Sequence, residues 1–349
     1  MAPAASATPP RVKSERVTPP AIPSKDVETK PRYDVMKIGS RSMKVAMFDH
    51  RKELDQKSAL AKILEKSDLQ PEVYEGGFKV WECACDLVTY LEGQKYEFSS
   101  KNILDFGCGH GLPGILALNQ GARLVCFQDL NAEVLRHVTI PNILLNTETT
   151  ADDLRKSDAN TWLIAGNWAD PELMKLMGGR KWDCILTSDT LYSLDSIPHL
   201  VRCIEKLLSP KGECFVAAKR YYFGIGGSTA ALIDEISEST ELQGEVIRVF
   251  DDGKSNLREL IRVVRKPPTS EAKAGQDESN DGCAGKKGSN EVAPGIPTTV
   301  DTRSRNANAR KRPSSSVATA ISGDANDDQG EAKKRLTTPV DPGGGTTAS

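Results

Sequence analysis

The residues in this sequence whose types and spacing best suit chemistry follow short apolar runs that are typical of buried strands. The first run leads into "NILDFGCGHGLPG", residues 102–114, which holds Gly107, Gly109, Gly111 and Gly114. A strand, a tight glycine turn and a helix in this order offer backbone N–H groups to a nucleotide-like ligand. The glycines fit Gly-x-Gly-x-Gly or a longer variant, so the loop alone does not separate a phosphate-bearing cofactor from one without phosphate.

Polar residues also follow the next three apolar runs, "ARLVCFQD", "TWLIAG" and "KWDCILTSD". In open α/β sheets, ligands bind at the carboxyl ends of the strands. Asp129 follows Asp105 at about the spacing expected of a carboxylate that grips both ribose hydroxyls, although an acid at a helix N-terminus fits the same place. Asp105 suits a strand-end acid bonded to loop amides. The other residues at these strand ends are Gln128, Leu130, Gly166, Asn167, Trp168, Ser188, Asp189 and Tyr192.

The elements that must position these residues alternate between strand and helix patterns. Helices are predicted for "LPGILALNQG", for "NAEVLRHVTIPNILLN" with a kink or break at Pro141, and for "IPHLVRCIEKLLS" with an end at Pro210 and Gly212. Near-continuous apolar strands between them indicate a parallel sheet covered on both faces. The run "EVIRVFDDGKSNLRELIRVV" adds two strands around a turn at Asp252. The pattern predicts an α/β fold, a Rossmann-like seven-stranded methyltransferase sheet with a C-terminal antiparallel hairpin, flanked by helices.

Composition divides the 349 residues into a core and two tails. Residues 1–32 contain no aromatic side chain, and residues 267–349 contain neither an aromatic nor a methionine. Such segments bury too little apolar surface to offset the entropy of ordering. We therefore predict a disordered N-terminal tail over residues 1–40, a helical lead-in over 41–69, a single folded domain over 70–266, and a disordered C-terminal tail over 267–349.

Charge and cysteine usage exclude several classes of function. Residues 267–349 carry eleven Lys or Arg against eleven Asp or Glu, so we expect no basic nucleic-acid arm. The 8 Cys and 4 His are dispersed without a Cys-x-x-Cys pair, so we expect no metal site. No apolar run reaches the length of a membrane span, and no secretory signal is evident. We expect a location in the cytoplasm and nucleus. The clusters at 310–312 and 333–335 fit nuclear-import signals or merely solvated charges.

Several motifs in the core carry a family resemblance. They occur in the order "VYEGGFKVWECACDLVTYL", "ILDFGCGHGLPGI", "FQDLN", "VTIPNILLN", "ILTSDTLY" and "KRYYFGIGG". Together they resemble the protein-histidine methyltransferase family of seven-β-strand enzymes, over about residues 70–266. The resemblance implies an enzyme that uses S-adenosylmethionine to methylate a histidine of a large-subunit ribosomal protein, as a protein-L-histidine N-tele-methyltransferase. The residues themselves leave open which ring nitrogen is methylated.

The resemblance also implies a cofactor pocket. Its residues are Val80, Trp81, Glu82, Cys83, Ala84, Gly107, Gly109, Gln128, Asp129, Leu130, Gly166, Asn167, Trp168 and Ser188. Most of these already stand at predicted strand ends. The upstream residues come only from the resemblance, because "FKVWECACDLVTYL" by spacing alone is an amphipathic helix with apolar residues in the core.

The side chain that receives the methyl group determines which other groups the active site needs. A histidine, with a reference pKa of about 6.5, is mostly neutral at pH 7, whereas a lysine at about 10.4 must first lose a proton. A histidine enzyme therefore needs an orienting hydrogen bond more than a strong base. The resemblance makes Asp189 and Tyr192 candidates for this catalytic role, although both also fit loop structure. Tyr222 and Phe223 suit an aromatic entrance for a protein substrate, or a turn.

Two alternatives to a histidine methyltransferase stay open. A protein-lysine methyltransferase would share the fold and the glycine loop, and a non-catalytic scaffold would act through the tails. Of the two, the scaffold fits less well with an intact loop and Asp129. We expect a monomer with a protein as its substrate, without direct nucleic-acid or membrane binding.

Overall fold

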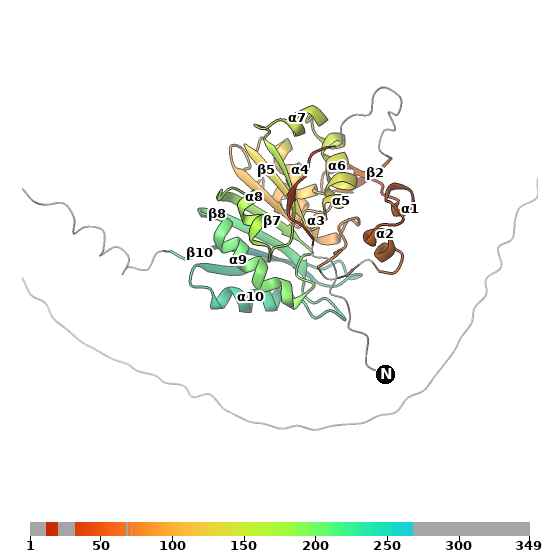
Figure 1. Cartoon of the computed structure of the whole chain (residues 1–349). Coiled ribbons are helices and arrows are strands. Elements are labelled where there is room, and N and C mark those ends of the chain that lie inside the picture. Colours follow the sequence, from red (N-terminus) through yellow and green to blue (C-terminus); the bar gives the residue numbers. More distant parts are fainter. Residues whose placement is uncertain (1–11, 20–31, 68, 71, 268–349) are drawn as a thin grey trace, which may run out of the picture. The chain divides into compact units, whose positions relative to one another are not determined.

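A computed structural model of the chain describes residues 12–19, 32–67, 69, 70 and 72–267. All of them lie in the first of two compact units, residues 1–280. Within these residues, eight strands form one sheet in the order β1-β6-β5-β4-β7-β8-β10-β9 (Figure 1). Its strands are β1 (Glu15–Arg16), β4 (Asn102–Phe106), β5 (Leu124–Asp129), β6 (Thr161–Ala165), β7 (Trp182–Ser188), β8 (Leu208–Lys219), β9 (Leu242–Phe250) and β10 (Arg258–Arg265).

The direction of the strands confirms the predicted sheet. Strands β4 to β8 are parallel to one another, while β10 is antiparallel to both β8 and β9. The C-terminal hairpin predicted around Asp252 is therefore present. Strand β4 lies between β5 and β7. The chain adds β5 and β6 on one side of β4 and then crosses over to add β7 on the other side, so the strand order reverses next to β4. In open α/β sheets this reversal opens a crevice at the carboxyl ends of the strands.

Helices cover both faces of the sheet, as near-continuous apolar strands require. Strand β4 shows the two faces, because Ile103 packs with one apolar cluster and Leu104 and Phe106 pack with the other. The first face carries α3 (Glu82–Gly93), α4 (Leu112–Asn119) and α6 (Ile140–Asn146). The second face carries α8 (Pro171–Leu176), α9 (Ile197–Leu207) and α10 (Thr229–Glu238).

The helical segment around Pro141 continues through the proline. Short helix α5 (Ala132–Val134) passes into a π-helix (Leu135–Thr139) and then into α6. Because proline lacks an N–H and its ring crowds the carbonyl of the preceding turn, a widened turn accommodates it without ending the helix. The expected irregularity at Pro141 is present as this π-turn.

The N-terminal part of the chain is more ordered than its composition suggests. Strand β1 pairs antiparallel with β6, and β2 (Tyr33–Ile38) forms a hairpin with β3 (Arg41–Ala46). The prediction of a disordered tail over residues 1–40 is therefore wrong for these strands. The lead-in over 41–69 begins with β3, and only then has helices α1 (His50–Glu53) and α2 (Ala59–Leu64). The tail predicted over 267–349 lies, apart from residue 267, outside the described residues.

Specific contacts of β1 explain why so short a strand is held. Val17 N–H donates to the carbonyl of Leu163 at 2.9 Å, and the Ser14 hydroxyl donates to Asp170 at 2.6 Å. The Arg16 guanidinium lies 4.5 Å from the centre of the Trp162 ring, a cation–π distance. These partners lie far along the sequence. The strand covers the edge of the sheet next to the carboxyl end of β6.

The remaining differences are small. Helix α9 ends at Leu207, earlier than the predicted stop at Pro210 and Gly212, because β8 begins at Leu208 and includes both residues. Helix α7 (Ala151–Arg155) precedes β6, and a 3-10 turn (Leu194–Ser196) precedes α9. In the described part of the chain, every helix falls short of the length and apolar character needed to cross a membrane.

Candidate active site

A cavity of about 380 Å³ opens at the carboxyl ends of β4 to β7, where the crevice was expected. This volume is in the range of small-molecule sites. Of the predicted cofactor residues, the cavity is lined by Val80, Trp81, Ala84, Gly107, Gly109, Asp129, Leu130, Gly166, Asn167, Trp168 and Ser188. Their contact with a cofactor stays a prediction, but the fold brings them together around one space.

The glycine loop is built around Gly109. Its φ of +50° lies in the left-handed region that disfavours side chains. A Cβ atom at Gly109 would also lie 3.3 Å from the carbonyl oxygen of Gly77. Glycine therefore lets the loop and the upstream "YEGG" segment approach closely. The two segments form adjacent parts of the cavity wall.

Asp129 fixes the loop at the end of β5. Its carboxylate accepts hydrogen bonds from the backbone N–H of Gly109 at 2.9 Å and of Asn131 at 3.2 Å. The side chain is buried but lines the cavity. Burial raises the pKa of Asp129 to about 6, against the hydrogen bond from Gly109 that lowers it. The carboxylate is thus ionised at pH 7 and keeps lone pairs for the hydroxyls of a ribose.

Gln128 does not line the cavity and holds its wall instead. The Gln128 amide donates to the carbonyls of Asp129 and Gly166, both at 2.8 Å, and its oxygen accepts from Trp168 Nε1 at 3.0 Å. Trp168 in turn stacks on Phe106 at 5.0 Å between ring centres. Trp168 therefore covers part of the core and also lines the cavity.

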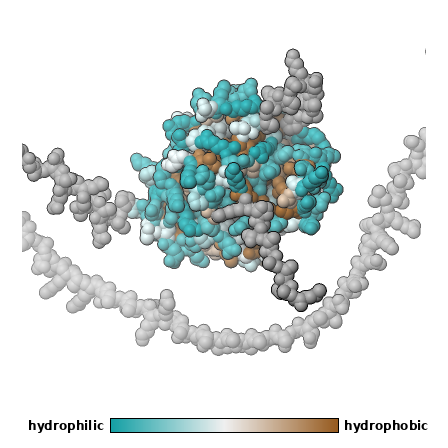
Figure 2. Space-filling view, viewed as in Figure 1, coloured by the Kyte–Doolittle hydropathy of each residue, from teal (hydrophilic) through white to brown (hydrophobic). Residues whose placement is uncertain are grey.

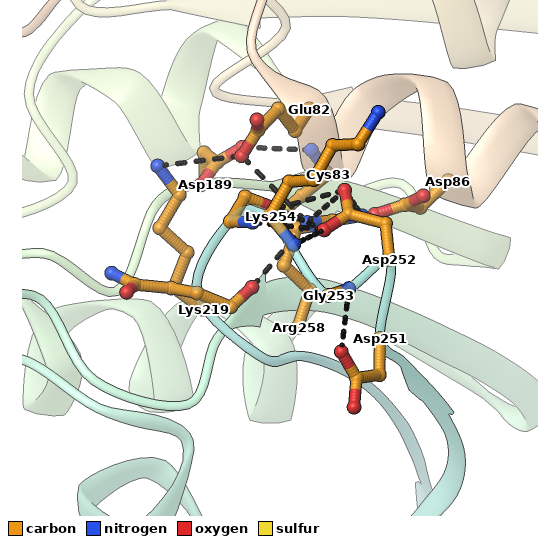
Figure 3. Close-up of polar contacts among 12 residues, drawn as sticks. Glu82, Cys83, Asp86, Asp189, Lys219, Asp251, Asp252, Gly253, Lys254 and Arg258 are labelled. Atoms are coloured by element: carbon orange, nitrogen blue, oxygen red, sulfur yellow. Dashed lines mark hydrogen bonds and ion pairs between the residues drawn. The ribbon is translucent and has the colours of Figure 1, made fainter.

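The N-terminus of α3 carries the upstream residues to the cavity, and an ion-pair network holds it there. Glu82 and Cys83 do not line the cavity. The Arg258 guanidinium binds Asp86 of α3, lies 3.8 Å from Glu82 Oε2, and contacts Asp252 of the β9–β10 turn at 3.3 Å (Figure 3). Lys219 Nζ lies 3.8 Å from the same Glu82 oxygen. This network ties the terminal hairpin to the helix that presents Val80, Trp81 and Ala84.

Asp189 is a structural junction in this geometry. Its φ is +53°, and its side chain is buried. One carboxylate oxygen accepts from the Cys83 N–H at 3.0 Å, and the other accepts from the Tyr222 hydroxyl at 2.9 Å. Asp189 thereby joins the end of β7 to α3 and to the loop after β8. It also lines the cavity, and its remaining lone pairs leave its proposed role toward an acceptor a prediction.

Tyr192 has a different partner, which the sequence patterns did not reveal. Its hydroxyl donates to Glu75 Oε2, while Glu75 Oε1 accepts from the Glu72 N–H at 2.9 Å. Both Tyr192 and Glu75 line the cavity. Burial raises the pKa of Tyr192 well above its usual value, and the Glu75 carboxylate adds to the rise. The phenol stays protonated, and its lone pairs are free to accept a hydrogen bond from a ligand.

The two aromatic residues predicted at the substrate entrance differ in their surroundings. Tyr222 is buried, and its hydroxyl is used by Asp189, whereas Phe223 is 72% exposed. Tyr221, which the motifs did not single out, is also exposed. Residues 223–225 form a turn whose Gly226 N–H donates to the Tyr222 carbonyl at 3.0 Å, so the buried Tyr222 anchors the loop while Tyr221 and Phe223 are exposed.

His110 and Asp105 hold the glycine loop through hydrogen bonds, and His110 also lines the cavity. His110 Nε2 lies 3.0 Å from the carbonyl of Phe78, and its other ring nitrogen lies 3.1 Å from the Asn142 amide. Burial lowers the pKa of His110, which keeps the ring neutral. Asp105 accepts from the Gly114 N–H at 2.9 Å and so joins β4 to α4, as a strand-end acid would. Among the residues that the structure describes, no group of His, Cys, Asp and Glu is placed to hold a metal ion.

The sheet order, with antiparallel β10 inserted between β8 and β9, is that of the Rossmann-like methyltransferases, and S-adenosylmethionine is their cofactor. The cavity fits this ligand, since the Asp129 carboxylate and the glycine loop both line it and are joined by the Gly109 N–H. Residues 66–223 match the family model described as lysine methyltransferase.

Several curated relatives of this chain are named histidine protein methyltransferases. Histidine protein methyltransferase 1 homologs from Dictyostelium discoideum and Rattus norvegicus are 41% and 38% identical, over 59% and 58% of this chain and 63% and 60% of theirs. Histidine protein methyltransferase 1 of Schizosaccharomyces pombe is 31% identical over 46% of this chain and 57% of its own. The chain thus spans about three-fifths of the length of these relatives. The resemblance to histidine methyltransferases inferred from the motifs is confirmed.

The raised pKa of Asp129 predicts how cofactor affinity depends on pH. Because the carboxylate is ionised only above about pH 6, we expect the affinity for S-adenosylhomocysteine to be constant above pH 7. Below pH 6 it should fall by up to about tenfold per pH unit, since one proton competes with the ribose hydroxyls. Isothermal titration calorimetry between pH 5 and 8 measures this. The Asp129→Asn variant should show a flat profile, and an equally steep one there would assign the titration to another group.

Proposed function

We propose that this protein transfers a methyl group from S-adenosylmethionine to a histidine side chain of a protein, and that the acceptor is a large-subunit ribosomal protein. The observation that carries the histidine assignment is the pair of Tyr192 and Glu75 in the cofactor cavity. The ribosomal acceptor rests on the motif resemblance. We further propose that the enzyme acts as a monomer in the cytoplasm and nucleus.

The Tyr192–Glu75 pair suits an imidazole better than an amine. A neutral imidazole has one N–H donor and one lone pair. Because the Tyr192 proton is directed to Glu75, the phenol oxygen can accept that N–H and leave the other ring nitrogen free to attack. A lysine ammonium next to Glu75 would instead be held in its charged, unreactive form. The site orients a nucleophile that is already neutral at pH 7.

The residues of this chain then act at defined points of the transfer. When bound, S-adenosylmethionine supplies a methyl group on a positively charged sulfur. Asp129 and the Gly109 loop hold the cofactor side of the cavity, and Tyr192 aligns the acceptor ring for in-line attack. The new N–C bond would form as the methyl–sulfur bond breaks, with its electron pair left on the sulfur and the positive charge moved to the ring. The Glu75 carboxylate, bound to the Tyr192 hydroxyl that holds the ring N–H, would stabilise that charge. The ring N–H proton is afterwards lost to solvent.

We propose the tele nitrogen, Nε2, as the methylated atom. Nε2 is the ring nitrogen farther from the substrate backbone, so it reaches deeper into a cavity than Nδ1. The Nδ1–H would then be the donor to Tyr192. Methylation at Nδ1 would require the acceptor backbone to enter the cavity more closely.

The runner-up is a protein-lysine methyltransferase of the same fold, which the description of the matching family model supports. A test uses large-subunit ribosomal proteins from cells that lack the enzyme, together with methyl-labelled S-adenosylmethionine. We expect label in protein, and methylhistidine after complete acid hydrolysis. Methyllysine as the labelled product would favour the runner-up. Absence of any transfer, with normal S-adenosylhomocysteine binding, would favour a non-catalytic scaffold.

A further inference from the structure

An apolar patch lies next to the mouth of the cavity. Ten large hydrophobic side chains are exposed among the described residues, and four of them fall in two short segments, as Leu194, Tyr221, Phe223 and Ile225. The face in Figure 2 is mostly hydrophilic, with hydrophobic residues at the surface only in small areas. A concentration of exposed apolar groups on a folded domain marks an interaction site.

The two segments form one surface because the backbone joins them. The Gly227 N–H donates to the carbonyl of Tyr192 at 3.1 Å, and Ser193 pairs with Gly226 in an isolated β-bridge. A Cβ atom at Gly226 would lie 3.6 Å from Leu194, which shows how closely they pack. The rings of Tyr221 and Phe223 meet edge to face, 5.1 Å apart.

This surface is anchored to the site rather than loosely attached. The hydroxyl of Tyr222 is bound by Asp189 at the end of β7, so the loop is fixed between its two outward-facing aromatic neighbours. Leu194 directly follows Ser193, which lines the cavity, and Asp195 and Ser196 line it as well. The patch therefore continues from the cavity rim, within reach of a few residues of extended chain at about 3.3 Å per residue.

The charge of the cavity indicates what kind of chain enters it. Among the described lining residues are five carboxylates, Glu72, Glu75, Asp129, Asp189 and Asp195, against one lysine ammonium, that of Lys79. Glu72 and Asp195 are exposed at the rim. Complementary charge raises the rate of encounter and fixes orientation. An acidic rim beside an apolar patch fits a basic segment that also carries a large apolar side chain.

We infer that the patch formed by Leu194, Tyr221, Phe223 and Ile225 docks the protein substrate, through a large apolar side chain a few residues from the methylated histidine in a basic segment. This inference rests on the proposed function, since it names the surface that selects its acceptor. Exposed aromatic rings supply most of the docking energy, as at other protein interfaces. The patch contributes to acceptor binding and not to the methyl transfer itself.

The test measures methyl transfer to large-subunit ribosomal proteins from cells that lack the enzyme, over a range of acceptor concentrations. The variants are Phe223→Ser and Tyr221→Ser, alone and combined. We expect the KM for the acceptor to rise about tenfold or more in the double variant, with kcat and the affinity for S-adenosylhomocysteine unchanged. Phe223→Ser alone changes a largely exposed ring, so it should fold normally and raise KM by a smaller factor.

Matched controls are Tyr33→Ser and Val249→Ser, which remove exposed apolar side chains that line no part of the cavity. Both should keep the KM of the unchanged protein within about twofold. An unchanged KM in the patch variants, or an equal rise in the controls, would overturn the inference while leaving the proposed function intact. A loss of kcat at unchanged KM would overturn it as well. Failure of the unchanged protein to methylate the acceptors would instead contradict the proposed function.

Discussion

Replacing Asp129 by Ala is expected to weaken S-adenosylhomocysteine binding by about 1–3 kcal/mol, a factor of roughly 5 to 150. The carboxylate is buried at the end of β5, lines the cavity, and has lone pairs beyond the bonds from Gly109 and Asn131. Its removal would leave two backbone N–H groups, those of Gly109 and Asn131, and the ribose hydroxyls that it is predicted to bind without this acceptor. Isothermal titration calorimetry at pH 7.5 measures the change.

A control for this variant is Asp183→Ala. Asp183 also accepts a backbone hydrogen bond, from the Asn102 N–H at 2.9 Å, but it lies at the start of β7 and does not line the cavity. That variant should lose stability without losing affinity for S-adenosylhomocysteine. If Asp129→Ala binds the ligand as tightly as the unchanged protein, the assignment of Asp129 to the ribose is wrong.

Replacing Tyr192 by Phe is expected to lower kcat for protein methylation by about 100-fold, with cofactor affinity changed less than about twofold. The substitution keeps the ring and removes only the oxygen that we propose accepts the N–H of the acceptor histidine. Positioned hydrogen-bonding and proton-transfer groups typically contribute factors of about 10² or more. Single-turnover measurements at saturating S-adenosylmethionine separate this effect from binding.

Two further variants make this result specific. Glu75→Gln retains an acceptor oxygen for the Tyr192 hydroxyl but loses the negative charge, so a smaller loss of about tenfold is expected. Tyr96→Phe is the matched control, because the Tyr96 hydroxyl also donates to a glutamate, Glu213, at 3.1 Å, outside the cavity. Full activity of Tyr192→Phe, or an equal loss in Tyr96→Phe, would remove Tyr192 from the acceptor site.

Much of the fold follows from local patterns in the sequence. The apolar runs that became β4 to β8 are nearly continuous, which is characteristic of parallel strands buried on both faces. Since such strands align their carboxyl ends, the residues after them could be gathered into one site without knowledge of the structure. This reasoning predicted that Gly109, Asp129 and Ser188 lie close together, and all three line the cavity.

The parts that were missed depend on contacts between distant segments. Strand β1 has two residues and no periodicity, and its order comes from partners on β6 and α8. Glu75 was part of a recognised motif, but only the fold shows that it meets the Tyr192 hydroxyl. The direction in which a side chain points also depends on tertiary contacts that the sequence does not show. Asp189 does line the cavity, so its role toward an acceptor stays a prediction, but its bonds with the Cys83 N–H and the Tyr222 hydroxyl were not predictable from the sequence.

Transfer of the methyl group to a histidine is tested most directly by mass spectrometry of large-subunit ribosomal proteins from cells with and without this protein. Fragmentation of the peptides places the methyl group on one residue. We predict a histidine methylated on Nε2 in the first sample and unmodified in the second, with methylation restored by the unchanged protein but not by Tyr192→Phe. A methylation that depends on this protein but lies on lysine, with every histidine the same in both samples, would contradict the histidine assignment.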